Sequence, residues 1–243
     1  RPVFLILNGI HPGEPDGIDA SMMLADTILL TEAGKKLLGN TVLLIVPSYN
    51  IDGMLNRGCC SRANQNGPEE YGFRGNARNL DLNRDFIKCD SENAKSFTRF
   101  FRTWNPHVLM DTHVSDGADY PYTMTLISTQ HNKLHPVVGS FLKQVFTPAL
   151  FKSMKEKGDE MIPYVNTKSY GDDPETGLYG FLETPRYATG YAALFNTIGF
   201  VAESHMLKPF PKRVQSTYRL LVSLLENVQS LSGKIVSLKK KAD

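Results

Sequence analysis

The sequence predicts an α/β domain in which helices cover both faces of a mixed, largely parallel sheet. Three observations support this class. Short continuous apolar runs occur at 3–7, 41–46, 108–110 and 200–202, as expected for strands buried on both faces. Segments with helical spacing of apolar residues lie between these runs, and Gly, Pro and Asn punctuate the connections. With 243 residues, 41% of them hydrophobic, the chain suffices for one core and one domain.

The N-terminal part begins with the strand 3–7, which a glycine-containing turn follows. A helix comes next, because three apolar residues recur at helical spacing: Met22, Ala25 and Leu29. Gly39 ends this helical region, and the run 41–46 predicts a second buried strand. Strand, helix and strand together form a βαβ unit.

The middle part contains a long loop, one helix and one strand. Residues 50–79 are rich in Gly, Asn and Arg without periodicity, and loops of this length in compact domains are usually functional or disordered. We favour a functional loop. An amphipathic helix then has apolar residues on one face: Ala94, Phe97, Phe101 and Trp104. Pro106 ends it and leads to the strand 108–110.

The C-terminal part alternates in the same way. We expect a strand at 124–128, a helical stretch at 141–154, a long surface loop at 158–180, a short helix at 191–196 and a strand at 200–202. A final helix has five residues on one face: Val214, Tyr218, Leu221, Leu225 and Val228.

Charge and apolar content exclude two classes of partner. A formal charge of +2 gives no strong field, and the one dense basic run is 239–241, so we expect no nucleic-acid partner. No apolar run approaches the roughly 20 residues that a membrane-spanning helix needs. Three cysteines, Cys59, Cys60 and Cys89, lack metal-type spacing; they permit one bridge and require none. Position 1 is Arg rather than Met, which indicates a processed or trimmed chain.

Three residues predict a zinc site. His11 and Glu14 lie in the tetrapeptide His-Pro-Gly-Glu after the first strand, and His113 follows the strand 108–110. Two imidazole nitrogens and one carboxylate oxygen leave a tetrahedral zinc ion one open position, which separates a catalytic zinc site from a closed structural one. A lone histidine at such a place is by default structural. The combination of the three residues at strand ends predicts one catalytic zinc ion.

The strand ends also explain why these residues should meet. In open α/β sheets, ligands bind beyond the carboxyl ends of the strands. His11 and Glu14 follow the first strand, 111–113 end a middle strand, and 203–205 end the last one. His205 lies two positions after Glu203 on the same side of its strand, and it either contacts the site or makes a hydrogen bond in the core.

The set His11-x-x-Glu14, Asp81-Leu82-Asn83-Arg84, His113 and Glu203 resembles the zinc carboxypeptidase family (peptidase family M14, the carboxypeptidase A-like enzymes). The resemblance covers nearly the whole chain. It implies that 1–243 form one catalytic domain with the fold of that family, which is shared with phosphorylase/hydrolase-like proteins. It also implies a zinc ion on His11, Glu14 and His113 and hydrolysis of a peptide-like bond next to a free carboxylate. Members of the family carry sequence before the His-x-x-Glu strand, so we expect N-terminal edge strands to be missing.

Glu203 is the candidate general base and acid, because a carboxylate beside the zinc can take a proton from water and return it to the leaving amine. The resemblance puts a glutamate at this strand end. The alternative is a structural ion pair of Glu203 with Lys208 or Arg213.

Arg84 is the candidate for binding the terminal carboxylate of the substrate, because a guanidinium group matches two carboxylate oxygens. Asn83 can add an amide donor, and the resemblance puts both residues in the specificity pocket. The alternative for Arg84 is a salt bridge with Asp81 or Asp85. The resemblance also implies that Asp81 accepts a hydrogen bond from His11; a helix N-cap is its competing role.

The remaining assignments come from the resemblance. Arg62 corresponds to the arginine that binds the scissile carbonyl oxygen as it becomes negative, although three other arginines share its loop: Arg57, Arg74 and Arg78. Tyr187 is the preferred tyrosine for covering the substrate, ahead of Tyr191 and Tyr179, and packing in the core is its alternative. The other histidines, His107, His131 and His135, are expected at the surface or in turns.

Three functions stay open. The first is a monomeric zinc carboxypeptidase that removes the C-terminal residue of peptides with a free carboxylate. The second is a related zinc amidase or deacylase that acts on cell-wall peptides or acylated amino acids, and the third is a non-catalytic domain with the same fold. Ala188, Ala192 and Ala193 bring no charge to the expected side-chain pocket, which favours neutral C-terminal residues. The compartment stays open, with a lean towards a secreted or periplasmic protein.

Overall fold

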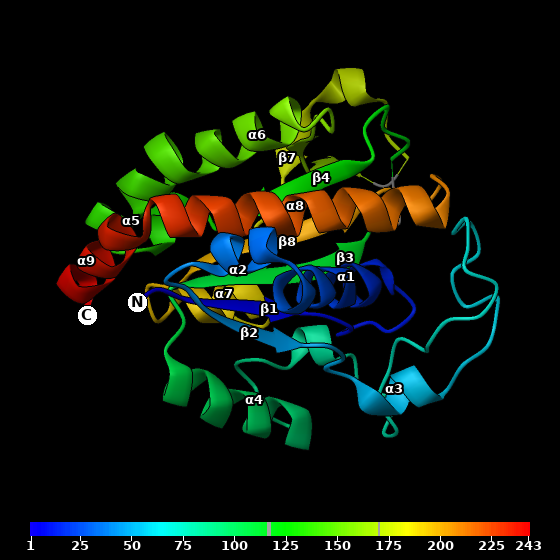
Figure 1. Ribbon diagram of the computed structural model, residues 1–243. Helices are drawn as coiled ribbons and strands as arrows, with labels where there is room; N and C mark the ends of the chain where they lie inside the picture. The colour runs from blue at the N-terminus through cyan, green and yellow to red at the C-terminus, as the bar shows by residue number, and fades with distance from the viewer. Residues whose placement is uncertain (116–117, 170) are drawn as a thin grey trace.

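A six-stranded sheet forms the centre of the molecule (Figure 1) in the computed structural model, which describes residues 1–115, 118–169 and 171–243. Its strands lie in the order β2-β1-β3-β8-β4-β5. Their bounds are β1 Val3–Leu7, β2 Val42–Val46, β3 Val108–Val114, β4 Met124–Ser128, β5 Ile162–Pro163 and β8 Ile198–Ser204. β1, β2, β3 and β8 are parallel, whereas β4 pairs with β8 in the antiparallel direction. This confirms the mixed, largely parallel sheet.

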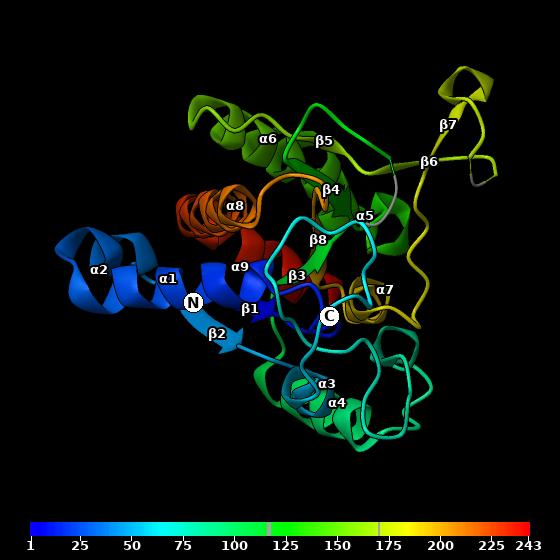
Figure 2. The ribbon, with the colours of Figure 1, turned by 90° about the vertical axis from the view of Figure 1, so that its right-hand side faces the viewer.

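Helices cover both faces of the sheet (Figure 2). On one face, α1 and α8 pack together, with α2, α5, α6 and α9 around them; α4 and α7 cover the other face. The helix bounds are α1 Asp16–Leu30, α2 Glu32–Leu38, α3 Ile51–Leu55, α4 Glu92–Trp104, α5 Pro136–Phe141, α6 Thr147–Glu156, α7 Ala188–Ala193, α8 Phe210–Ser230 and α9 Ser232–Ala242. A π-helical turn, Leu142–Phe146, joins α5 to α6.

The period-two alternation of β1 divides the core into two layers. Phe4 and Ile6 belong to the apolar cluster under α1 and α8, whereas Leu5 and Leu7 belong to the cluster under α4 and α7. All four side chains are fully buried. Burial of each stabilises the fold by about 1.5–3 kcal/mol relative to exposure, which is why the run reads as uninterrupted apolar sequence.

The expectation that the strand at 41–46 is buried is wrong, and the helix α1 buries other residues than the ones whose spacing predicted it. In α1 the residues that carried the helical spacing face solvent, with Met22 58% and Leu29 71% exposed, while Leu24 and Ile28 are buried. This helix has two apolar stripes, and the buried one is continuous with Gly17, where the backbone touches Thr112 of β3. β2 is half-buried rather than buried, because it lies at the edge of the sheet.

The loop expected at 158–180 contains short elements that pattern cannot reveal. β5 pairs with β4, and β6 (Val165–Thr167) pairs with β7 (Leu178–Gly180) in a hairpin that projects from the body of the molecule (Figure 2). The sequence also gave no indication of α9, which buries Ile235 and Leu238. Among the described residues, no helix has both the length and the apolar character needed to cross a membrane.

The parallel strands bring their carboxyl ends to one edge of the sheet. Leu7 of β1 lies opposite Asp111 of β3, and His113 of β3 lies opposite Glu203 of β8. In Figure 1 the loop around residues 56–79 lies at this edge, and Figure 2 shows it in front of the strand ends. The edge is where the sequence places the metal-binding and catalytic candidates.

Candidate metal centre and adjoining cavity

His11, Glu14 and His113 lie together at the carboxyl edge of the sheet, and one ligand atom from each falls within 4.8 Å of the others. Nδ1 of His11 is 3.3 Å from Oε1 of Glu14, and Nδ1 of His113 is 2.8 Å from Oε2 of the same carboxylate. The three side chains are at most 5% exposed. The predicted metal-binding group is therefore assembled in the fold.

Local sequence accounts for this position. β1 ends at Leu7, and Gly9 then adopts a left-handed backbone (φ +63°), which glycine allows at no steric cost. The amide of Glu14 donates to the carbonyl of His11 at 2.9 Å, so a turn presents both side chains just before α1 begins. His113 lies on β3, the strand next to β1, two residues beyond Asp111 in the same face of the strand.

The two candidate metal-binding histidines face Glu14 with Nδ1, and a second carboxylate contacts the Nε2 of each ring and orients it. Nε2 of His11 lies 2.9 Å from Oδ1 of Asp81, and Nε2 of His113 lies 3.1 Å from Oδ2 of Asp111. Such contacts make Nε2 the protonated nitrogen and leave Nδ1 as the donor atom for a metal. Oδ1 of Asp81 also accepts from the amide of Asn83 at the start of the 3₁₀ turn Leu82–Arg84. The two roles expected for Asp81 are thus both present.

Charges around Glu14 keep the site ionised. Burial opposes ionisation of Glu14, but the Arg62 guanidinium and His11 outweigh it and hold the Glu14 pKa well below its usual range. Burial likewise opposes protonation of His113, yet Asp111 and Glu14 raise the His113 pKa well above its ordinary value. A divalent cation would replace the proton as the positive partner of Glu14. Two imidazole nitrogens and a carboxylate are a donor set that fits zinc.

One cavity joins the metal centre to the other candidates. The predicted residues that line it are His11, Glu14, Asn83, Arg84, His113, Tyr187 and Glu203. Glu203 is adjacent to His113 because the two are register partners on neighbouring parallel strands. Arg213, one of the two alternative ion-pair partners expected for Glu203, is fully buried and binds Asp16 instead, with 2.8 Å between its Nε and Oδ2 of Asp16. Nζ of Lys208 lies 3.9 Å from Asp119.

The Asp-Leu-Asn-Arg motif supplies the polar wall of this cavity. The Arg84 guanidinium stacks on the Tyr187 ring, with 4.6 Å from Cζ to the ring centroid, and donates to the Asn83 carbonyl at 2.9 Å. Nδ2 of Asn83 lies 3.4 Å from Nε2 of His113. Of the three tyrosines considered, Tyr187 is the one that lines the cavity; Tyr191 is buried among phenylalanines and Tyr179 lies half-exposed on β7.

Two arginines of the long loop approach the metal donors. Nη1 of Arg62 donates to Oε1 of Glu14 at 2.6 Å, and Nη2 donates to the carbonyls of Val114 and Ser115. Arg74 donates to Oδ2 of Asp81 through Nε and Nη2, and its Nη1 lies 3.3 Å from Nδ1 of His11. Arg74 lines the cavity described above, and both arginines line a second cavity beside it.

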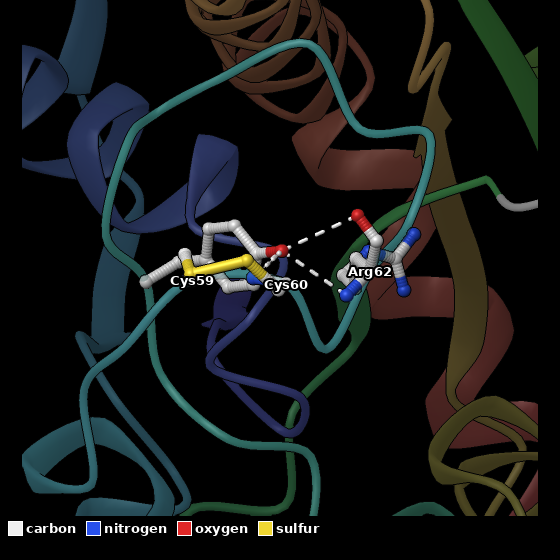
Figure 3. Close-up of a disulfide and its surroundings, with 4 residues drawn as sticks. Cys59, Cys60 and Arg62 are labelled. Atoms are coloured by element: carbon white, nitrogen blue, oxygen red, sulfur yellow. Dashed lines mark hydrogen bonds between the residues drawn. A yellow bond between two sulfur atoms is a disulfide. The ribbon is translucent and has the colours of Figure 1, made fainter.

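A disulfide between adjacent residues precedes Arg62 (Figure 3). Cys59 and Cys60 form this bridge, whereas Cys89 is a free thiol. The hydroxyl of buried Tyr71 accepts from the amides of Cys60 and Arg62, at 3.1 and 3.0 Å. These contacts fix the backbone from which the Arg62 side chain reaches Glu14.

The other histidines lie away from the centre. His205 is buried and takes the core role: its Nε2 accepts from the amide of Tyr120 at 2.9 Å and contacts Asp119. His131 and His135 are exposed, as expected. His107 is half-buried rather than at the surface, because its Nδ1 accepts from the amide of Val3.

Sequence reasoning missed two acidic residues of the cavity. Asp111 orients His113, and the period-two spacing of the pair along β3 was an available signal. Glu183 also lines the cavity, although it is 1% exposed. No local pattern marks Glu183, because its polar partners come from residues 130 and 133.

Fold and site together define an α/β protein with a His-Glu-His zinc centre. The chain belongs to the zinc carboxypeptidase family, whose model matches residues 1–172. Carboxypeptidase 2 of Trichophyton tonsurans is 32% identical over 107 residues, which are 43% of this chain and 17% of the fungal protein. Carboxypeptidase 2 of Trichophyton rubrum is 31% identical over the same length. The match thus covers less than a fifth of these relatives.

Two solved structures of bacterial proteins share this fold. A metallo-carboxypeptidase from Pseudomonas aeruginosa superposes with a TM-score of 0.67 at 14% identity, over 96% of this chain and 58% of that one. A metallo-carboxypeptidase from Burkholderia cenocepacia gives a TM-score of 0.69 at 16% identity, over 95% and 58%. At these identities the likeness establishes the fold, and this chain spans little more than half of either protein.

Proposed function

We propose that the chain is a zinc-dependent carboxypeptidase that hydrolyses the C-terminal peptide bond of peptides. One observation carries this proposal: the cavity that contains the zinc donors is also lined by Arg84 and Asn83. A guanidinium and an amide beside a Lewis-acid site suit a substrate whose free carboxylate lies next to the bond to be cut. Membership in the zinc carboxypeptidase family supports the same reaction.

Glu203 is the proposed proton-transfer residue. When bound, zinc would polarise the scissile carbonyl and lower the pKa of a water molecule towards about 7. The Glu203 carboxylate, beside His113 on the next strand, would take a proton from the attacking water and pass it to the leaving amine. Its partly buried position next to the metal donors supports this role.

Arg84 and Asn83 would hold the terminal carboxylate, and Tyr187 would cover the bound residue. The stacking of Arg84 on Tyr187 supports the pairing, because a held guanidinium loses less freedom when it binds. Arg62 is the proposed donor to the carbonyl oxygen. Arg74, from the same loop, is the second candidate, since it lines the cavity and is more exposed than Arg62.

The variant Glu203→Gln tests the proposal. We expect kcat for release of a C-terminal amino acid to fall by about 10²–10⁴, because proton transfer is lost. The zinc content should stay at one ion per chain, because Glu203 is outside the donor set. Glu156→Gln, on an exposed position of α6, is the matched control and should keep full activity.

Three outcomes separate the functions. Stoichiometric zinc with no Glu203-dependent release from any peptide would overturn the enzyme and favour a binding domain. Hydrolysis confined to acylated amino acids or cell-wall peptides, with ordinary C-terminal peptides uncut, would favour the amidase or deacylase. Glu203-dependent release of single C-terminal residues would support the carboxypeptidase.

A further inference from the structure

Glu183 is a buried acid in the wall of the cavity, in the segment between β7 and α7. It is 1% exposed. Oε1 accepts from the amide of Gln130 at 3.0 Å and lies 3.5 Å from Nζ of Lys133, whose ammonium group also contacts the Glu183 carbonyl. Oε2 is buried and has no hydrogen-bond partner among the described residues.

An unsatisfied carboxylate oxygen in a protein interior is costly and rare, so it needs an explanation. Lys133 and the Gln130 amide occupy the other oxygen, and they fix the carboxylate in one orientation. The acceptor left over would be satisfied by a donor that enters the cavity. Because the acceptor is anionic, a cationic donor gains most from it.

The residues around Glu183 indicate what kind of cationic group could enter the cavity and donate to Oε2. Ile127 and Val201 line the same cavity and offer apolar contact to a chain of methylene groups. Asn83 and Arg84, the proposed carboxylate-binding residues, line it as well. Its volume is about 140 Å³, below the roughly 300–1,000 Å³ of sites for drug-sized ligands, which suits a single amino-acid side chain.

The other acids of the lining have partners or a role of their own. Oδ1 of Asp111 also lacks a partner among the described residues, but Oδ2 of Asp111 binds the metal donor His113, so this carboxylate is committed to the metal centre. Glu203 is assigned to proton transfer. Glu183 is therefore the acid in the described lining that can serve recognition of the substrate side chain. Its position favours a cationic side chain, whereas the uncharged alanines of α7 favoured a neutral one.

We propose that Glu183 is a specificity-determining residue that selects substrates with a basic C-terminal residue, arginine or lysine. This inference rests on the proposed carboxypeptidase function. In the bound substrate, the carboxylate lies at Arg84, the methylene stem runs along Ile127 and Val201, and the cationic group meets Oε2 of Glu183.

Peptides that differ only in the charge of the C-terminal side chain test the effect of that charge on the rate of hydrolysis. N-acylated dipeptides that differ only at the C-terminus carry arginine or its neutral isostere citrulline, and lysine or norleucine. For the zinc-loaded chain, we expect kcat/KM to be about 10- to 100-fold higher for each cationic member, the range of a hydrogen bond to a charged group. Glu183→Gln, which keeps the acceptor for the Gln130 amide, should bring the arginine peptide to the level of the citrulline peptide and leave the latter unchanged. Glu175→Gln, an exposed residue of the same chain region, should keep the preference.

Binding gives a readout that does not depend on turnover. Titration calorimetry with N-acetylarginine and N-acetylcitrulline should show tighter binding of the arginine ligand to the wild-type chain and equal binding to Glu183→Gln. Equal affinity of the wild-type chain for the two ligands would overturn the inference, as would a preference that survives in Glu183→Gln. If both the charged and the neutral peptide are cut at the same rate, the specificity fails while the carboxypeptidase function stands. If neither peptide is cut, the proposed carboxypeptidase function is wrong. The calorimetric comparison of the two ligands then still tests whether Glu183 binds the cationic group.

Discussion

Asp81 performs two tasks with one carboxylate oxygen. Its Oδ1 accepts from Nε2 of His11 and from the amide of Asn83, at 2.9 Å in both cases. Burial disfavours the charged form, but the hydrogen bond from His11 and the charge of Arg74 lower the Asp81 pKa strongly. The residue therefore stays ionised at neutral pH and links a zinc donor to the turn that presents Arg84.

Asp81→Ala should weaken zinc binding by about 10- to 100-fold, because His11 loses the partner that orients its ring. A metal-competition titration with a chromogenic chelator measures this change. Asp173→Ala is the control, since Asp173 also caps a 3₁₀ turn but lies far along the chain in an exposed position. Equal zinc affinity in the two variants would show that Asp81 acts only as a cap.

Residues of the site differ in how far sequence can predict them. His11 and Glu14 are three positions apart after an apolar run, so their meeting follows from local structure. His113 and Glu203 required only the rule that parallel strands end at one edge. Glu183 could not be predicted, because its burial depends on contacts with residues some 50 positions away, and Arg74 resembles any other arginine of a polar loop.

At the scale of elements, His107 joins β1 and β3 ahead of their first register pair, Phe4 and Val108. Its amide donates to the Val3 carbonyl at 2.8 Å, and its Nδ1 accepts from the Val3 amide at 3.1 Å. Burial, aided by the positive charge of Lys239, lowers the His107 pKa to about 4. The neutral ring is therefore the form that holds the start of β1.

Acid should destabilise this junction in a defined window. An unfolded histidine has a pKa of about 6.5, so between pH 6.5 and 4 the unfolded chain binds more protons than the folded one. Stability from the neutral ring is present above pH 6.5 and is lost as pH falls towards 4. The variant His107→Asn keeps an acceptor for the Val3 amide but has no titrating ring. As pH falls through this window, the free energy of unfolding of the wild-type chain should therefore drop by about 1 kcal/mol more than that of the variant, a value reduced because His107 is partly exposed.

Urea unfolding of both proteins at pH 7 and pH 4.5 measures this difference. Parallel curves, with the same loss of unfolding free energy in the two proteins, would contradict a neutral His107 in the folded state.

The elements also show where pattern is enough and where it is not. The limits of β1 coincide with an apolar run, because buried strands admit few polar residues, and those of β4 coincide with the expected strand 124–128. The sequence does not show which side of α1 is buried, because two apolar stripes compete and only packing against β3 and α8 decides between them. β2 reads as buried although an edge position leaves it half-exposed, since its sequence does not show which neighbours it has.

For the whole molecule, Arg213 connects segments that are far apart in sequence. It is fully buried on α8 and binds both oxygens of Asp16 at the start of α1. Its terminal nitrogens also donate to the carbonyls of four residues: Asn66, Gly67, Met206 and Lys208. The Arg213 side chain thus binds three separate segments: the long loop, the segment after β8 and the start of α1.

Arg213→Met should lower the free energy of unfolding by about 3–5 kcal/mol, because the Asp16 carboxylate would stay buried without its partner. Arg219→Met, on the same helix, is the control; its partly exposed pair with Asp159 should be worth less than about 1 kcal/mol. Equal denaturation midpoints for the two variants would contradict this role of Arg213.

The disulfide before Arg62 has a consequence that its position in the sequence determines. Covalent cross-links stabilise folds mainly by shortening long loops in the unfolded chain, and a bond between Cys59 and Cys60 closes no loop at all. Its influence is therefore confined to the turn in which it lies. A change from oxidising to reducing surroundings would leave the thermal stability of the domain nearly untouched, while the chain that carries Arg62 towards Glu14 would lose one of its local constraints.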